Sequence, residues 1–376
     1  IAMQCRAEGV ETLVIVSDDI LRTRETGALA AAETIHPRAE LEAIQRRLRE
    51  TEGVTVIIYD QTCAAEKRRR RKKGLMPDPK KRLFINDRVC EGCGDCSVQS
   101  NCIAVEPLET PFGRKRQINQ NSCNKDYSCN DGFCPSFVTL DGAEPAKPDQ
   151  TSLVSREMVT FATLSYPVLP ELKAGTEFGL LVAGIGGTGV VTVGGVLSMA
   201  AHLDGKGATV LDFTGLAQKN GAVISQVKIA ANQEDICVPR ILQHNTDLVI
   251  GCDMVVTASN ANFYGKGKTK AVVNDAEIPT AHFTQNTDMD FPAAAEREAI
   301  ERATGADAAS FLNAGEIAEQ LFGNTIATNM FLVGYAWQKG LLPLSLEAIM
   351  QAIKLNGVAI DANKRYFSWG RVYADK

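Results

Sequence analysis

The chain has 376 residues, of which 45% are hydrophobic, so it can bury substantial cores, and its length suggests two or three domains. Its 45 acidic and 40 basic residues leave a formal net charge of −5, which argues against a molecule that binds nucleic acid or a membrane surface over its whole extent. The first residues lack a cationic start followed by a continuous apolar core, so no secretory signal is predicted and a cytoplasmic location is expected.

The first 65 residues alternate apolar strands with a polar helix. Residues 11–19 and 53–61 contain runs that are apolar on both faces, which is typical of buried parallel strands. Between them, Leu41, Ile44 and Leu48 recur at helical spacing. Because two strands cannot form a domain alone, we expect this region to be the tail of a larger α/β domain or to pack against a partner.

A run of positive charge follows, with ten Lys and Arg residues among the 16 residues 67–82 and only Asp78 opposing them. Such a run is often a solvated linker, or a nucleic-acid-like patch that arises from composition alone. Its neighbour in the sequence is a cysteine-rich segment. The run therefore also fits a second role, in which it attracts an acidic electron carrier or offsets the charge of metal-bound thiolates within about 10 Å.

Seven of the eleven cysteines fall within the 45 residues 90–134, in a segment with few long apolar runs. A disulfide framework is not favoured, because the total is odd and a reducing compartment keeps thiols free. Metal binding is the better interpretation, since a domain with so small a core needs a metal to stabilise it. The other four cysteines are scattered singly and are predicted to be small core residues: Cys5, Cys63, Cys237 and Cys252.

Three cysteines of this segment are separated by two residues each, so one tight loop, eased by Gly92 and Gly94, can wrap three corners of a cuboidal four-iron cluster. Ferredoxins of the bacterial type take a further ligand from a distant cysteine followed by proline, and Pro135 follows such a cysteine here. The predicted ligands of a first 4Fe-4S cluster are Cys90, Cys93, Cys96 and Cys134.

Three cysteines are left over, Cys102, Cys123 and Cys129, where a second four-iron cluster needs four ligands. Their spacing is looser than the usual pattern. Either another group or a partner completes a second cluster, or the three hold a three-iron cluster, or there is one cluster only. Zinc is the competing metal, but it is normally bound by two Cys-x2-Cys pairs or with histidine, and no histidine lies between His36 and His202.

Residues 178–203 carry no charged side chain and are numerous enough to span a membrane, but their seven glycines favour a strand, a glycine turn and a helix inside an α/β domain. The amides of such a turn and the N-terminus of its helix would face an anion such as a phosphate. A turn needed only for close packing is the alternative. The expected ligand-binding residues are Gly184, Gly186, Gly187, Gly189, Asp212 as a ribose-binding carboxylate, and Lys219 as a phosphate contact.

From about residue 176 onward, strand and helix patterns alternate, which predicts a parallel sheet covered on both sides by helices. Asp247 and Asp253 flank one of these strands and are predicted to be strand-end residues rather than catalysts. The expected strands are residues 178–187, 208–213, 223–230, 247–253 and 270–275, and helices are expected from residue 307 onward.

The chain contains, in this order, the phrases CEGCGDCSVQSNC, SCNKDYSCNDGFCPSF, AGIGGTGVVTVGG and LNGVAIDANKRYFSWGR. In these it resembles the fused indolepyruvate ferredoxin oxidoreductases, which belong to the thiamine-dependent 2-oxoacid:ferredoxin oxidoreductases. The resemblance covers nearly the whole chain. It implies an α/β protein with the end of a thiamine diphosphate-binding domain in residues 1–75, a ferredoxin-like iron-sulfur domain in residues 76–150, a linker in residues 151–175 and a Rossmann-like gamma domain in residues 176–376.

The resemblance also implies a chemistry. In that family a 2-oxo acid, typically an aryl pyruvate, is decarboxylated on thiamine diphosphate with Mg, electrons leave singly through iron-sulfur clusters to an acceptor such as ferredoxin, and coenzyme A takes the acyl group. The gamma domain is implied to lie near coenzyme A and subunit contacts, which lowers the expectation of NAD. The chain lacks the thiamine motif, GDG followed by Asn, so a thiamine-bearing segment or subunit is expected elsewhere, and no residue here is predicted to be catalytic.

The first hypothesis is therefore the electron-carrying part of an indolepyruvate-type oxidoreductase, which is expected to be an oligomer. The alternative is a stand-alone iron-sulfur electron-transfer protein with an NAD- or flavin-binding Rossmann domain. A third hypothesis, a zinc-dependent nucleic-acid module, is disfavoured by the acidic total. Neither a nucleic acid nor a membrane is expected as a partner.

Overall fold

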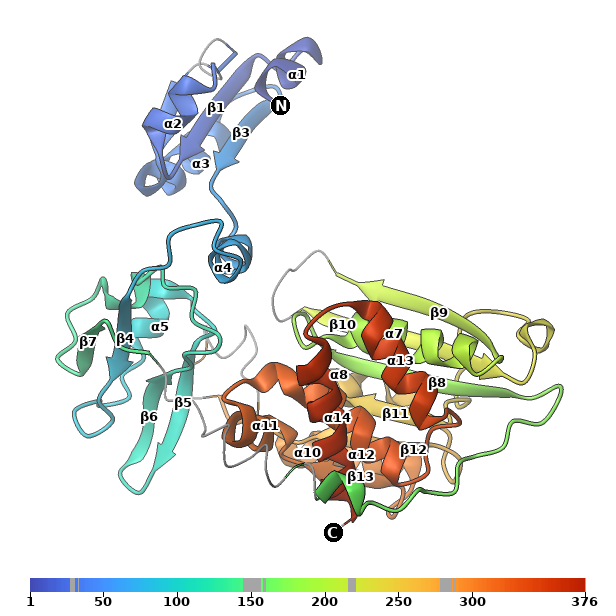
Figure 1. Cartoon of the computed structure of the whole chain (residues 1–376). Helices are drawn as coiled ribbons and strands as arrows, with labels where there is room; N and C mark the ends of the chain where they lie inside the picture. Colours follow the sequence, from blue (N-terminus) through green and yellow to red (C-terminus); the bar gives the residue numbers. More distant parts are fainter. Residues whose placement is uncertain are drawn as a thin grey trace. The chain divides into compact units, whose positions relative to one another are not determined.

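A computed structural model of the chain describes residues 1–27, 31–32, 34–144, 157, 160–215, 221–277, 286 and 289–375. The chain divides into two compact units, Ile1–Asp78 and Pro79–Lys376, and each is described by itself (Figure 1). The division follows residue 78, whereas the resemblance places the first domain boundary after residue 75.

The first unit contains a parallel sheet with the strand order β2-β1-β3. Alternate side chains of the central strand point to opposite faces, so Leu13 and Ile15 pack in one apolar cluster, and Val14 and Val16 pack in another with the helix α3. The two predicted strands and the predicted helix are confirmed. The elements are α1 Ala2–Ala7, β1 Thr12–Ser17, α2 Ile20–Glu25, β2 Thr34–Pro37, α3 Leu41–Arg49 and β3 Thr55–Asp60.

The strand β2 was not expected from the sequence, because it has no apolar run and its residues are exposed or half-buried. The first part of the basic run is helical and forms most of the helix α4, Ala64–Lys72. Lysine and arginine are good helix formers, and Glu66 forms ion pairs with Arg69 and Arg70 one turn further along.

The second unit contains a six-stranded sheet in the order β13-β12-β11-β8-β10-β9. Residues 178–203 form the strand β8 and the helix α7 joined by a glycine turn, as predicted, and no helix in the described part of the chain is long and apolar enough to cross a membrane. The strands are β8 Glu177–Ile185, β9 Gly207–Thr214, β10 Ala222–Ala230, β11 Leu248–Gly251, β12 Lys270–Asn274 and β13 Ala309–Leu312.

The expectation of a fully parallel sheet is wrong at β10, which pairs antiparallel with both β8 and β9. Only seven residues separate β9 from β10, and a parallel connection needs about a dozen or more residues to cross back over the sheet. The expectation of helices from residue 307 onward is also wrong at its start, where β13 joins the edge of the sheet.

Helices cover both faces of this sheet (Figure 1). One face packs against α7, α12, α13 and α14 in a large apolar cluster that includes Trp337 and Phe331, and the other packs against α8 and α10. The helices are α7 Val190–Leu203, α8 Met254–Ser259, α10 Ala293–Thr304, α11 Ala314–Phe322, α12 Thr328–Gln338, α13 Leu346–Asn356 and α14 Ile360–Asp375.

The cysteine-rich part of the second unit is built differently. It has two separate antiparallel strand pairs, β4 with β7 and β5 with β6, and one short helix. In the described residues of segment 79–143, no side chain belongs to any of the four apolar clusters of the protein. The elements are β4 Lys81–Ile85, α5 Asp95–Ser100, β5 Val105–Thr110, β6 Gly113–Ile118, η3 Ser128–Asn130 and β7 Phe137–Asp141.

The helices α12 and α14 cross at a pair of glycines. A Cβ atom on Gly334 would overlap the carbonyl of Phe367, and a Cβ atom on Gly370 would overlap the carbonyl of Phe331. The backbones of the two helices therefore approach each other more closely than any side chain would allow. By contrast, a Cβ atom on Gly195 of α7 would meet no atom within 4 Å.

We expect Gly370→Ala to lower the free energy of unfolding by about 1–3 kcal/mol, because overpacking outweighs the gain of about 1 kcal/mol in helix propensity. Gly195→Ala should instead stabilise the chain by about 0.5–1 kcal/mol. The measurement is the midpoint of urea unfolding for each variant, since several domains make an absolute value ill defined. A Gly370→Ala midpoint at or above that of the parent chain would contradict the close crossing.

Candidate functional site

The structure brings three predicted ligands of the first cluster together. The pKa of the Cys96 thiol is raised to about 11, mainly by burial, with Arg116 opposing the rise and the neighbouring thiols of Cys90 and Cys134 contributing to it. Cys90 lies in the loop before α5, Cys96 in the first turn of α5, and Cys134 three residues before β7. Cys93 lies in the same loop as Cys90 and is exposed.

The three leftover cysteines also lie together. Burial raises the pKa of the Cys129 thiol to about 12, and the thiols of Cys102 and Cys123 and the carboxylate of Asp126 contribute in the same direction. A weaker contribution comes from Cys96, so the two groups of thiols are neighbours. Residues scattered over the sequence thus gather into two groups of sulfur atoms, which we call the first and the second thiol group.

Several donors point at these sulfurs. The amide of Gly92 donates to Sγ of Cys90 at 3.4 Å, and the amide of Lys125 donates to Sγ of Cys123 at 3.4 Å. Sγ of Cys134 lies 2.9 Å from Oγ of Ser136. Hydrogen bonds to cluster sulfurs are one of the terms that set the reduction potential of an iron-sulfur centre.

A buried cation lies beside the first thiol group. Arg116 on β6 is only 1% exposed, and its charge lowers the pKa of Cys96 against the effect of burial. Nη1 of Arg116 also donates to the carbonyl of Lys115 at 3.1 Å. Sequence reasoning missed Arg116, because it sits among other basic residues in a strand and nothing in the pattern sets it apart.

The glycines of this segment are required by close contacts. A Cβ atom on Gly92 would overlap the carbonyl of Arg114 on β6, and Gly92 has a positive φ of 73°. Gly94 begins α5 in the left-handed region with a φ of 82°. A Cβ atom on Gly132 would overlap the carboxylate of Asp95. The loop that carries Cys90, Cys93 and Cys96 therefore folds as tightly as the spacing predicted.

Among the described residues, no three His, Cys, Asp or Glu side chains converge on one point in the way that a single metal ion requires. A cuboidal cluster differs from a single ion, because each cysteine binds a different iron and the sulfurs stand apart from one another. The donor set is made of sulfur, with no histidine in this segment. These residues fit an iron-sulfur cluster better than a tetrahedral zinc ion.

The four single cysteines do not share one environment. Cys252 is buried in the large core cluster, and Cys5 packs at the edge of the first unit's core, as predicted. The prediction is wrong for Cys63 and Cys237, which are exposed. Cys63 precedes the helix α4, and Cys237 lies in a connection outside the strands, so neither belongs to a strand that would have buried it.

The glycine turn lies between β8 and α7, at the carboxyl end of β8. Gly187 and Gly189 have positive φ values of 97° and 82°, which favour glycine. Gly184 serves packing, since a Cβ atom there would lie 2.8 Å from Thr188 Oγ1 and 2.9 Å from Cys252 Cβ. Among the described residues, no side chain caps the N-terminus of α7.

The other two residues predicted for this site are placed differently. Asp212 is exposed on β9, and through Ser225 of β10 it lies level with Val182 in the middle of β8, two strand spacings or about 10 Å to the side. The glycine turn lies further along the chain, beyond the end of β8. Lys219 lies outside the described residues. Asp253 caps α8 by accepting from the amide of Val256 at 2.8 Å, and Asp247 accepts from the amide of Gly179 at 2.7 Å, as expected of strand-end residues.

One residue at the turn was not found by sequence reasoning. Asn329 of α12 is 6% exposed, and a Cβ atom on Gly189 would overlap its amide nitrogen. Its oxygen accepts from the amide of Met330 at 2.6 Å, which leaves the nitrogen directed at the turn. The only signal in the sequence is an asparagine in an otherwise apolar helix, 140 residues further along the chain than the turn.

Comparison with known proteins gives consistent matches. Residues 179–373 match the family model for pyruvate ferredoxin/flavodoxin oxidoreductase. The indolepyruvate oxidoreductase subunit IorB of Archaeoglobus fulgidus is 26% identical over 197 residues, covering 51% of this chain and 92% of that protein. The subunit of the same name from Thermococcus kodakarensis is 27% identical over 197 residues, covering 52% and 94%.

Two solved structures also match. The pyruvate oxidoreductase subunit PORC of Thermotoga maritima is 22% identical with a TM-score of 0.37, covering 52% of this chain and 95% of that chain. The 2-oxoglutarate:ferredoxin oxidoreductase of Magnetococcus marinus, solved with 2-oxoglutarate, coenzyme A and succinyl-CoA bound, is 15% identical with a TM-score of 0.40, covering 53% and 31%.

The family match takes in more than half of the 376 residues and includes the whole sheet except its first residues. The class is thus an oxidoreductase that acts on 2-oxo acids. The chain belongs to the pyruvate ferredoxin/flavodoxin oxidoreductase family. The family resemblance noted in the sequence is confirmed at this level.

The raised thiol pKa values make a prediction for iron-free protein. At neutral pH, Cys96 and Cys129 are protonated, so iodoacetamide should modify them far more slowly than the exposed Cys237. Raising the pH towards 11 increases the thiolate fraction of Cys96 and Cys129 and should speed the modification of both. The measurement is mass spectrometry of the labelled peptides over time. Equal rates for Cys96 and Cys237 at neutral pH would show that Cys96 is not buried as described.

Proposed function

We propose that this chain is the electron-carrying part of a 2-oxoacid:ferredoxin oxidoreductase of the indolepyruvate type, which converts an aryl pyruvate to an acyl-CoA and CO2. The observation that carries the proposal is the gathering of two thiol groups in segment 79–143 of a chain whose residues 179–373 match this family. In the complete enzyme, electrons would pass through these groups to an acceptor such as ferredoxin.

The first thiol group would hold a 4Fe-4S cluster through Cys90, Cys93, Cys96 and Cys134. The second would hold another through Cys102, Cys123 and Cys129, with Asp126 as the candidate fourth ligand, because its carboxylate is close enough to raise the pKa of Cys129. Such clusters, when bound, accept and release single electrons.

The chain's own residues bind, orient and shield these groups. Arg116 would offset the negative charge of the first group from a buried position. The amides of Gly92 and Lys125 would hold Sγ of Cys90 and Cys123 in place and stabilise added negative charge. Because Cys96 lies within electrostatic reach of Cys129, an electron could move between two neighbouring centres inside one segment.

The remaining parts of the enzyme belong to partners in this proposal. We assign thiamine diphosphate and Mg to a segment or subunit that supplies the missing thiamine motif, and the assembly to an oligomer, as the subunit names of the relatives suggest. Residues 1–78 would be the end of the thiamine-binding domain. A cytoplasmic location suits the seven clustered thiols, because reducing compartments keep thiols free.

The glycine turn is the proposed contact for a phosphate of coenzyme A. In the sheet, β10 and β9 lie on one side of β8, and β11 lies on the other side. The strand order therefore reverses at β8, and ligands of open α/β sheets bind at such a reversal. The uncapped N-terminus of α7 and the amide of Asn329 supply donors there. A dinucleotide is less well supported, because β10 separates Asp212 from the turn.

Iron content tests the electron-carrying role. Anaerobically purified protein should contain about eight irons per chain, and Cys96→Ser or Cys129→Ser should each remove about four. Cys237→Ser is the matched control, since this exposed cysteine lies outside both thiol groups, and its iron content should be that of the parent. Iron content that stays unchanged in Cys96→Ser would contradict the ligand assignment.

Binding of coenzyme A tests the glycine turn. We expect Gly189→Ala to weaken binding about tenfold or more, because the new methyl group displaces Asn329 and the positive φ becomes strained. Gly195→Ala, in the same helix but in open space, should bind as the parent chain does. Titration calorimetry with the full chain measures both. Equal affinity of the two variants would exclude the turn as the site.

A further inference from the structure

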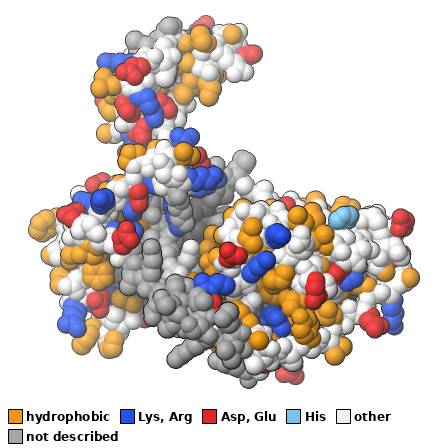
Figure 2. All heavy atoms as spheres, in the orientation of Figure 1, with side chains coloured by type: hydrophobic (Ala, Val, Ile, Leu, Met, Phe, Trp, Pro, Cys, Tyr) orange, Lys and Arg blue, Asp and Glu red, His pale blue; other side chains and the backbone are white. Residues whose placement is uncertain are grey.

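A pocket on the basic helix of the first unit has no role in the proposed function. Glu66, Arg69, Arg70, Lys73 and Leu75 line it, and its volume is about 490 Å³. Small-molecule sites typically measure about 300–1,000 Å³, so the pocket is of the right size for a ligand. Figure 2 shows Lys and Arg side chains reaching the surface over α4.

The pocket is organised by one carboxylate. Oε1 of Glu66 accepts from Nε of Arg70 at 3.0 Å, and Oε2 forms an ion pair with Nη2 of Arg69 at 3.0 Å. The hydrogen bond from Arg70 and the charge of Arg69 lower the pKa of Glu66, so this carboxylate is ionised and pairs with both guanidinium groups. Lys73 makes no ion pair with any described residue. Three cations and one carboxylate leave two net positive charges at the pocket.

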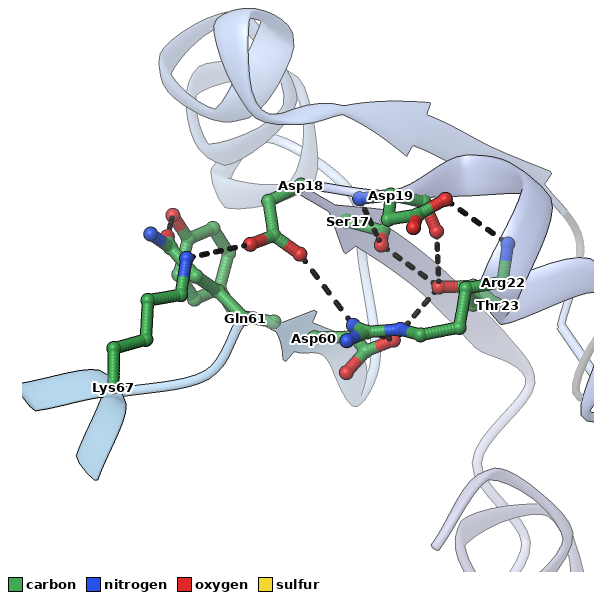
Figure 3. Close-up of polar contacts among 9 residues, drawn as sticks. Ser17, Asp18, Asp19, Arg22, Thr23, Asp60, Gln61 and Lys67 are labelled. Atoms are coloured by element: carbon green, nitrogen blue, oxygen red, sulfur yellow. Dashed lines mark hydrogen bonds and ion pairs between the residues drawn. The ribbon is translucent and has the colours of Figure 1, made fainter. Parts of the chain in front are cut away.

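The four charged residues share one face of the helix, because they are spaced by three or four positions. Lys67 instead forms an ion pair with Asp18 at the end of β1, at 3.2 Å (Figure 3). Asp18 also forms an ion pair with Arg22, at 3.4 Å. The contact of Lys67 ties α4 to the sheet of its own unit and leaves the pocket face to solvent.

We propose that this pocket binds the phosphate group of a small ligand, either a phosphomonoester or a pyrophosphate. A phosphomonoester carries about 1.5 to 2 negative charges at neutral pH and a pyrophosphate carries more, so the two net positive charges of the pocket attract either group. Guanidinium groups offer paired N–H donors to phosphate oxygens, and Lys73 adds a point charge. Leu75 is 73% exposed and supplies an apolar wall for the rest of the ligand. The proposal does not rest on the thiol groups or on the glycine turn.

The test is titration calorimetry of the full chain with pyrophosphate, ADP and, as an uncharged reference, adenosine. Pyrophosphate and ADP should bind and adenosine should not. Arg70→Gln and Lys73→Gln should each weaken pyrophosphate binding about tenfold, as expected for the loss of one charge-assisted contact. Tighter binding of ADP than of pyrophosphate would identify a nucleotide as the ligand class, and equal binding would show that the phosphate group alone is recognised.

Two control variants test whether pyrophosphate binds at this pocket or is attracted by positive charge in general. Arg47→Gln removes one positive charge from an exposed position on α3 of the same unit and should leave pyrophosphate binding unchanged. Arg302→Gln removes one positive charge from an exposed position on α10 of the other unit and should also leave it unchanged. If Arg47→Gln weakened binding as much as Lys73→Gln, the attraction would be general and the proposal would be wrong. It would also be wrong if a single-stranded oligonucleotide bound more tightly than ADP, with affinity rising with its length.

Discussion

The cysteine-rich segment depends on sulfur where other domains depend on hydrocarbon. In its described residues, 79–143, it contributes nothing to the four apolar clusters, and its large aromatic side chains Phe112 and Phe133 point to solvent. Its buried residues are few: Leu83, Ile85, Ala104 and Val105 on the apolar side, with Cys90, Cys96, Ser97, Arg116 and Ser136. A small core of this kind is commonly supplemented by covalent or metal links. In the proposed function the thiol groups supply those links and the chemistry of the segment.

The clustering of thiols also governs the charge of the segment. Thiols packed together raise one another's pKa in the absence of a metal, which costs free energy whenever they ionise. A metal ion or cluster reverses this cost, because it binds thiolates and displaces their protons. Arg116 and the amides directed at sulfur then face groups of opposite charge. The proposed function therefore assigns this segment a metal-bound state, whereas the parallel sheet of the first unit and the mixed sheet of the second have conventional apolar cores.

Much of this arrangement could be predicted from the sequence where local patterns decide it. The turn between β8 and α7 followed from glycine density, and the tight loop of Cys90, Cys93 and Cys96 followed from spacing. The antiparallel β10 could not be predicted from its apolar pattern, because pattern reports burial and not direction. The grouping of Cys102 with Cys123 and Cys129, and the approach of Asn329 to Gly189, depend on contacts between distant parts of the chain.

The most direct test of the central claim is low-temperature electron paramagnetic resonance of anaerobically purified protein after reduction with dithionite. The account predicts signals of reduced 4Fe-4S clusters, broadened by the magnetic interaction of two neighbouring centres, since Cys96 lies close to Cys129. A protein that gave no iron signal and contained zinc in the thiol groups would contradict the account.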